Sequence, residues 1–329
     1  MDLNSKGGDI MRKVIVYRSL PKNKLEFLKK YFDISYFPEV SNPLENKEFI
    51  KELKTTDALF GAGMEITEEL LNEALNLKVI SNFSAGYDNL NLKILSEKGI
   101  IATNSPDVLS DTVADLIFSL LLTTSRRIVE LDSFIRKGCW HEKINEKLFG
   151  VDVHNKTIGM LGLGRIGKKV AQRALGFEMN ILYHKRSRDM QAEKIYQARY
   201  VENLDMLLAK SDFICITLPL NENTKHMINY EKMKKMKSNA IIVNASRGSI
   251  IKELDLIKAL KNNVINGAGL DVFEEEPIEI TNELIDLNNV VLTPHIGSAT
   301  TKTREKMIEQ GIDNLIDALN GKIPNNLLN

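Results

Sequence analysis

Three side chains of different chemistry occur in the C-terminal half of the chain. His295 follows the apolar run 290–293, Arg247 follows the run 240–244, and Glu276 ends a row of three glutamates. An imidazole exchanges a proton near neutral pH, and a neighbouring carboxylate favours its protonated form. A guanidinium binds a carboxylate through paired hydrogen bonds. Together the three groups predict a site that binds a small carboxylic acid and gives a proton to its carbonyl oxygen.

The same residues also have ordinary structural interpretations. A histidine after a strand is often structural, a glutamate among three is usually solvated, and Arg247 fits a surface or phosphate-facing position. Spacing along the chain does not show whether His295, Arg247 and Glu276 meet in space. From the residues alone, both interpretations stay open.

A glycine-rich loop follows the apolar run 157–161 and opens a helical pattern. Gly162 permits a tight turn, Gly164 lets the backbone approach a pyrophosphate, and Gly167 lets the helix pack against the strand. The start of the helix offers backbone amides and a partial positive charge to phosphates. Between a strand and a helix this pattern predicts a dinucleotide site, made by Gly162, Leu163, Gly164, Arg165, Ile166 and Gly167.

The end of the next expected strand is basic. Chains that bind NAD usually carry an acid there for the ribose 2′-hydroxyl, but here Lys185, Arg186 and Ser187 precede the first acid, Asp189. An acid would repel a 2′-phosphate, whereas these three side chains can bind one. The sequence therefore predicts NADP(H) as the preferred cofactor, with NAD(H) possible. The alternative interpretation is an ordinary basic surface turn.

The elements that must position these groups alternate between short β-branched runs and longer helical patterns. This order is typical of parallel sheets covered by helices, so the fold class is α/β with a Rossmann-type doubly wound sheet around the glycine loop. Helices are expected at 23–32, 109–137 and 301–319. Strands are expected at 14–17, 58–60, 79–80, 100–102, 157–161, 180–183, 213–218, 240–244, 266–270 and 290–293.

Composition narrows the class of partners. The chain has 44 basic and 44 acidic residues, and this balance argues against nucleic-acid binding and against a membrane surface. Residues 1–10 are polar and lack the apolar centre of a secretory signal. Its two cysteines form no C-x-x-C pair, so no metal site is expected and both thiols should stay reduced in the cytoplasm.

Five segments, in this order, resemble the D-isomer-specific 2-hydroxyacid dehydrogenase family over nearly the whole chain after Met11. Within the family, residues 149–154 and 297–300 resemble the bacterial glyoxylate/hydroxypyruvate reductases and 2-ketogluconate reductases. The resemblance implies an oxidoreductase that reduces glyoxylate, hydroxypyruvate or 2-ketogluconate to the D-2-hydroxy acid, preferring NADPH. The five segments are Ser84–Asn89, Gly162–Gly167, Asn244–Gly248, Gly269–Pro277 and Thr293–Ala299.

The resemblance also implies roles for individual residues. Arg247 would bind the carboxylate and carbonyl of the substrate, His295 would be the general acid, and Glu276 would favour its protonated form. The amides of Ala85 and Gly86 would hold the substrate carboxylate. Asp271 would hydrogen-bond the nicotinamide carboxamide, and the cofactor would also be lined by Pro219, Ala245, Ser246, Arg247, His295 and Gly297.

The family architecture implies two domains. A flavodoxin-like substrate domain would comprise residues 11–105 and 299–329, and a Rossmann-type cofactor domain, 106–298, would be inserted into it. Two copies would form a homodimer, largely through the helix expected at 109–137.

Two other functions stay open. One is an NAD-dependent D-lactate or D-3-phosphoglycerate dehydrogenase, which the basic segment 185–188 disfavours. The other is a nucleotide-sensing binding protein like the family's corepressors, which keep the same three site residues. A formate dehydrogenase is excluded, because the family's formate enzymes replace the glutamate that is present here as Glu276.

Overall fold

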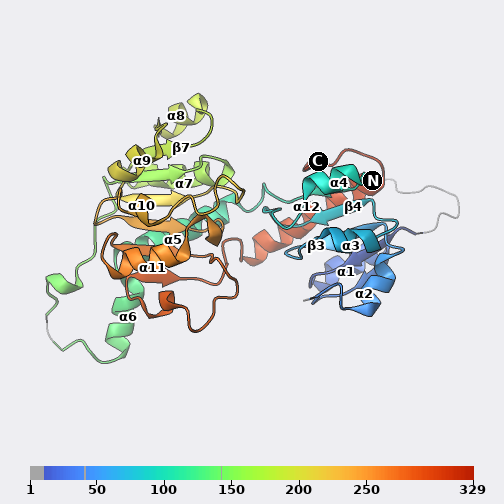
Figure 1. The fold of residues 1–329 in the computed structure, drawn as a ribbon, viewed down its shortest axis with the longest axis horizontal. Coiled ribbons are helices and arrows are strands. Elements are labelled where there is room, and N and C mark those ends of the chain that lie inside the picture. The colour runs from blue at the N-terminus through green and yellow to red at the C-terminus, as the bar shows by residue number, and fades with distance from the viewer. Residues whose placement is uncertain (1–10, 41, 142) are drawn as a thin grey trace. The chain divides into compact units, whose positions relative to one another are not determined.

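The computed structural model describes residues 11–40, 42–141 and 143–329. These residues form two compact units, the first built from the described residues up to Leu109 together with Thr301–Asn329, the second from Ser110–Thr300 (Figure 1). The chain therefore leaves unit 1 and later returns to it. The expectation for residues 1–10 lies outside the described residues.

Unit 1 is built on a parallel five-stranded sheet in the order β2-β1-β3-β4-β5. This is the flavodoxin-like order, as the sequence predicted. The edge strand β2 was missed, because its residues are only partly buried and carry no clear apolar run. The strands are β1 (Lys13–Val16), β2 (Asp33–Tyr36), β3 (Ala58–Gly61), β4 (Val79–Asn82) and β5 (Ile101–Thr103).

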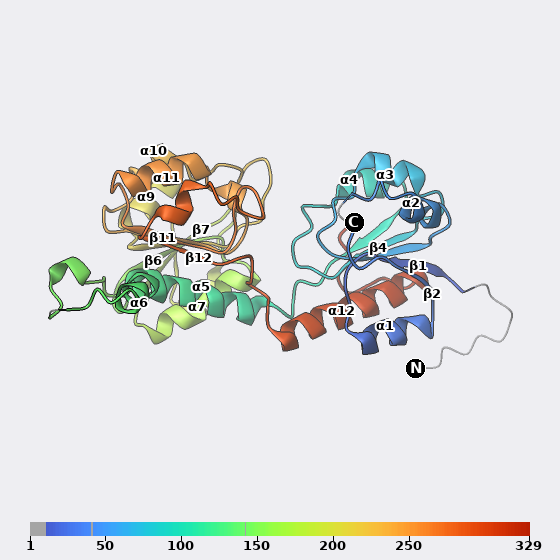
Figure 2. The ribbon, with the colours of Figure 1, turned by 90° about the horizontal axis from the view of Figure 1, so that it is seen from below.

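Helices cover both faces of this sheet because successive side chains of a strand point to opposite faces. Val14 and Val16 pack toward one core with Ile312, whereas Ile15 packs toward the other with Phe49. The first core lies under α1 (Lys22–Lys29) and α12 (Thr301–Leu319), as Figure 2 shows. The second lies under α2 (Lys47–Leu53), α3 (Glu68–Glu73) and α4 (Leu92–Glu97).

Unit 2 is built on a parallel seven-stranded sheet in the order β12-β11-β10-β9-β6-β7-β8. The order reverses between β6 and β9, which is the Rossmann-type switch point that the glycine loop predicted. The two-residue strand β8 was too short to be predicted. The strands are β6 (Thr157–Leu161), β7 (Asn180–His184), β8 (Arg199–Tyr200), β9 (Phe213–Ile216), β10 (Ile241–Asn244), β11 (Gly267–Leu270) and β12 (Val290–Leu292).

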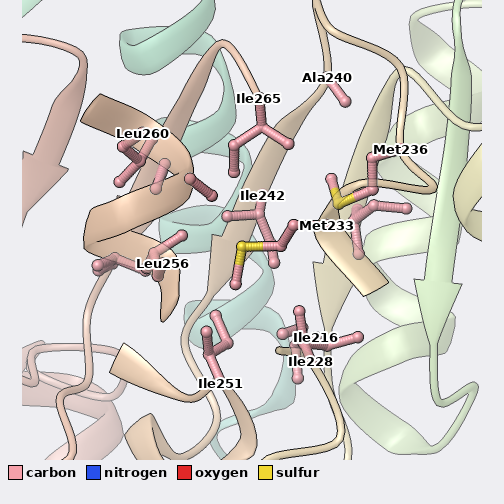
Figure 3. Packing of buried hydrophobic residues seen from close by; sticks show 14 of the residues in the cluster. Ile216, Ile228, Met233, Met236, Ala240, Ile242, Ile251, Leu256, Leu260 and Ile265 are labelled. Carbon is pink, nitrogen blue, oxygen red and sulfur yellow. The ribbon is translucent and has the colours of Figure 1, made fainter. Parts of the chain in front are cut away.

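Helices α5 (Ser110–Ser125) and α7 (Arg165–Gly176) lie on one face of this sheet. The other face is covered by α9 (Leu204–Lys210), α10 (Tyr230–Met233) and α11 (Glu253–Lys261), while α8 (Met190–Tyr196) follows β7. Figure 3 shows the core beneath α10 and α11, where Met233 packs beside Ile242. This apolar layer fixes β9, β10 and β11, whose carboxyl ends carry the residues discussed below.

The prediction of one continuous helix at 109–137 is wrong. This segment forms two helices, α5 and α6 (Ile128–Arg136). Arg127 between them is left-handed, with φ 55°. Its guanidinium binds Glu130 at 2.6 Å and the carbonyl oxygen of Phe149 at 3.3 Å. The contact with Phe149, which is distant in the chain, stabilises a helix break that the helix-forming residues on either side do not reveal. Among the described residues, no helix is both long and apolar enough to cross a membrane.

Candidate active site

His295 and Glu276 are joined by a short hydrogen bond. Nδ1 of His295 lies 2.6 Å from Oε2 of Glu276, while the other oxygen, Oε1, accepts from the amide of Phe273 at 3.1 Å. Burial raises the pKa of Glu276, but the hydrogen bond and charge of His295, the amide of Phe273 and the charge of Arg247 outweigh burial and lower it overall. An ionised carboxylate therefore fixes Nδ1 as the protonated ring nitrogen that faces it. In the described part of the chain, Nε2 of His295 has no hydrogen-bond partner.

Asp271 holds the turn that carries His295. Its buried carboxylate accepts from the Thr293 hydroxyl at 2.6 Å and from the amides of Ile296 and Gly297 at 2.8 Å each. Its backbone oxygen accepts from the amide of His295 at 3.0 Å. Burial raises the pKa of Asp271, and the three donors offset only part of that effect. His295 itself is left-handed, with φ 52°, so this network supports a backbone conformation that L-residues disfavour.

Arg247 stands on the loop after β10. The side chain of buried Asn244 holds this loop, since its amide donates to the Arg247 carbonyl at 2.9 Å and its oxygen accepts from the Ser246 amide at 3.1 Å. The Ser246 hydroxyl donates to the carbonyl of Leu218. Nη1 of Arg247 donates to the Ser246 carbonyl at 2.8 Å.

Gly248 brings this loop against the loop that carries Glu276. A Cβ added at Gly248 would lie 1.9 Å from the carbonyl carbon of Phe273 and 2.5 Å from the amide nitrogen of Glu274. The two backbones therefore touch where only glycine fits. The contact brings Arg247 near Glu276 and His295. The three residues are therefore close in space, which their spacing in the sequence could not show. The role of Gly248 could not be predicted from the sequence, because its partner, Phe273, is distant in the chain.

The glycine loop has the features expected of a dinucleotide site. Gly162 has φ 94°, and a Cβ on Gly167 would lie 2.8 Å from the Gly162 carbonyl oxygen. A Cβ on Gly164 would meet nothing within 4 Å, so this backbone faces open space. Gly164 also caps α7 without a side-chain hydrogen bond, as is typical of a helix start that binds a phosphate. These residues fit a pyrophosphate.

Ion pairs occupy part of the basic segment after β7. Arg188 binds Glu193 through two bonds of 2.7 and 2.8 Å, and this pairing together with the Tyr183 hydroxyl lowers the pKa of Glu193 to about 2. Lys185 lies 3.8 Å from Asp189, whereas Arg186 and Ser187 are exposed. Arg188 is therefore engaged within the protein.

The other residues expected at the cofactor lie at the carboxyl ends of the same strands. Leu163, Arg165 and Ile166 belong to the loop and first turn after β6, Pro219 follows β9, and Ala245 follows β10. Gly297 is buried beside Asp271 in the turn after β12. In the described residues no group of His, Cys, Asp and Glu could hold a metal ion, and Cys139 and Cys215 are free.

In unit 1, the loop after β4 turns its carbonyl groups inward. Asn104 donates to the carbonyl of Ala85 at 2.8 Å, while Ser84 and Asn82 donate to that of Gly86 at 2.7 and 3.0 Å. The amides of Ala85 and Gly86 have no hydrogen-bond acceptor among the described residues. A loop that is held through its carbonyl groups, while its amides remain available as donors, is suited to binding an anion.

Two aromatic side chains of unit 1 lie in its core. Phe60 and Phe83 are buried, with ring centroids 5.0 Å apart, and both pack against Gly311 of α12. Their apolar character reflects packing under this helix.

Comparison with known proteins decides the family. A family model described as D-isomer specific 2-hydroxyacid dehydrogenase, NAD binding domain, matches residues 118–297. Glyoxylate/hydroxypyruvate reductase B of Yersinia pestis bv. Antiqua is 45% identical over 317 residues, which is 96% of this chain and 97% of the relative. The chain belongs to the D-isomer-specific 2-hydroxyacid dehydrogenase family. The family predicted from five motifs is thus confirmed, and the protein is an oxidoreductase.

Solved structures agree with this assignment. A protein from Thermus thermophilus is similar with a TM-score of 0.87 and 35% identity, over 96% of this chain and 100% of that one. The NADPH-dependent glyoxylate/hydroxypyruvate reductase of Sinorhizobium meliloti, in complex with NADP and malonate, has a TM-score of 0.87 and 28% identity, over 97% of each chain. This chain therefore has the same fold as both proteins over nearly its whole length.

Proposed function

We propose that this dehydrogenase reduces small 2-oxo acids (glyoxylate, hydroxypyruvate and 2-ketogluconate) to D-2-hydroxy acids with NADPH as the preferred cofactor. The observation that carries the proposal is the 2.6 Å His295–Glu276 pair beside Arg247. Reduction of a carbonyl needs a hydride on carbon and a proton on oxygen. The relatives named for glyoxylate and hydroxypyruvate support the substrate class.

The residues of unit 2 have distinct tasks in this reaction. Arg247 binds the carboxylate and polarises the carbonyl of the substrate. His295 donates the proton on Nε2 to the carbonyl oxygen, and Glu276 stabilises the imidazolium that exists before transfer. When bound, the nicotinamide supplies the hydride. The amides of Ala85 and Gly86 in unit 1 bind the substrate carboxylate.

The cofactor would be held by residues already described. The loop Gly162–Gly167 would bind the pyrophosphate, with Lys185, Arg186 and Ser187 around the 2′-phosphate. Asp271 would hold the carboxamide, and the remaining contacts would come from Pro219, Ala245, Ser246 and Gly297. The Sinorhizobium meliloti relative in complex with NADP supports this preference.

Domain roles and assembly form a further part of the proposal. Residues 11–105 with 299–329 bind the substrate, and residues 106–298 bind the cofactor. Two copies associate in the cytoplasm through the region of α5 and α6. Exposed apolar side chains gather there, namely Ile128, Val129, Ile135, Trp140, Ile144 and Phe149.

The test is the loss of reduced-nicotinamide absorbance with each of the three 2-oxo acids, at equal NADPH and NADH concentrations. We expect turnover with NADPH and a much slower reaction for His295→Gln. Preference for NADH, with D-lactate or D-3-phosphoglycerate oxidised by NAD, would favour the NAD-dependent dehydrogenase. Nucleotide binding without turnover of any acid would favour the corepressor-like protein.

A further inference from the structure

A second histidine, His226, contacts both the segment that follows Arg247 and the loop that carries Glu276. Its amide donates to the Ser249 carbonyl at 2.7 Å, and two residues later Ile228 donates to the Ile250 carbonyl at 3.1 Å. The backbone from His226 thus runs along the segment that follows Arg247. His226 adopts a left-handed conformation, with φ 53°, to do so.

The side chain of His226 reaches the other loop. Its Nε2 lies 2.6 Å from Oε1 of Glu274, two residues before Glu276. The amide of Glu274 donates to Oε2 of Glu253 at 3.0 Å, and Glu253 in turn accepts from Asn282 at 2.6 Å. His226 and Glu274 are both partly shielded from solvent, with 39% and 30% of their side chains exposed. This second His–Glu pair is formed by side chains other than those of His295 and Glu276.

We propose that His226 is a positioning residue for reduction, which acts through Glu274 to hold the loop 273–276 so that Glu276 stays bonded to His295. Its backbone is tied to the Arg247 loop and its ring to the Glu276 loop, so one residue fixes both. The contact of Gly248 with Phe273 contributes only weak dispersion, whereas His226 adds a directional bond to each of the two loops. The proposal rests on the proposed function only where turnover is the readout.

The kinetic test compares His226→Ala and His226→Gln with His154→Ala, a histidine that is 67% exposed on the same unit. We expect kcat with glyoxylate and NADPH to fall about 10-fold in His226→Ala, since small misplacements of reacting groups are costly. NADPH affinity, measured by fluorescence, should not change. His226→Gln keeps a donor for Glu274 and should recover most of the rate, and His154→Ala should behave as wild type.

A double variant distinguishes a positioning effect of His226 on Glu276 from a non-specific loss of activity. In a Glu276→Gln background, adding His226→Ala should lower kcat no further, because its effect passes through Glu276. Equal losses in both backgrounds, or a parallel loss of NADPH affinity, would overturn the proposal. The proposal would also be overturned if kcat of His226→Ala equalled kcat of His154→Ala.

A second readout needs no turnover. The downfield imidazole N–H resonance of His295, identified by its loss in Glu276→Gln, should shift or broaden in His226→Ala and stay unchanged in His154→Ala. An unaltered resonance in His226→Ala would overturn the proposal. If the wild type reduces none of the three acids, the proposed function fails while this measurement still decides the role of His226.

Discussion

The backbone of Gly248 lies against the carbonyl group of Phe273 so closely that a Cβ would come within 1.9 Å of it. Gly248→Ala must therefore push the Arg247 and Glu276 loops apart. We expect a stability loss of about 1–3 kcal/mol, as overpacking usually costs, with a fall in kcat/KM of about 100-fold. Urea unfolding and steady-state kinetics measure both.

Gly176→Ala is the matched control for that change. Gly176 ends α7, and a Cβ there meets nothing within 4 Å. It should leave kinetics unchanged and alter stability by less than about 1 kcal/mol. Similar kinetics for the two alanine variants would show that the loops adapt.

Glu276→Gln should lower kcat about 100-fold or more, because the imidazole loses the carboxylate that binds its Nδ1 and orients the ring. The fold lowers the pKa of Glu276, so its ionised form stabilises the protein above the ordinary glutamate pKa. That contribution disappears as the pH falls through the lowered pKa. Wild type should therefore lose more stability than Glu276→Gln between neutral and acidic pH, as urea unfolding at both pH values measures. Equal losses would contradict this assignment.

Removing Lys185 and Arg186 together should raise KM for NADPH about 10-fold or more and leave KM for NADH nearly unchanged. The reason is that only NADPH carries the 2′-phosphate. Lys194→Ala on α8 removes an exposed charge nearby and is the control. Equal effects on both cofactors would point to an ordinary basic turn.

Charged substitutions on α6 should separate the proposed dimer. Val129 and Ile135 are 54% and 55% exposed and belong to the group of exposed apolar side chains in and after α6, and a group of this kind is typical of an interface. Val129→Asp with Ile135→Asp should convert the dimer to monomers in sedimentation analysis. Leu254→Asp on α11, 71% exposed in wild type, should not. A wild type that sediments as a monomer would refute the homodimer itself.

Local sequence signals predicted much of this fold and site. The helix expected at 301–319 has those bounds as α12, and the glycine loop stands between β6 and α7 as its spacing required. His295 and Arg247 could be selected because both follow parallel strands, whose carboxyl ends share one edge of the sheet.

Contacts between distant segments could not be predicted. The break at Arg127 depends on the Phe149 carbonyl, and the closeness of Gly248 to Phe273 depends on how two loops pack. Asp271 was assigned to the cofactor, but the structure also shows it holding the His295 turn through three hydrogen bonds. None of these pairings leaves a periodic or compositional signal.

The return of the chain to unit 1 has a consequence for its synthesis. Unit 2 is one continuous segment, Ser110–Thr300, so all of it has been made before α12. Unit 1 needs Ile308, Ile312 and Leu315 of α12 for its core, and Asn329 for a bond to the amide of Ala102 at 2.8 Å. Since domains fold as units during translation, the half that begins first must finish last. Until α12 has been made, the part of the unit 1 sheet that this helix covers stays exposed, so we expect chaperones to bind there.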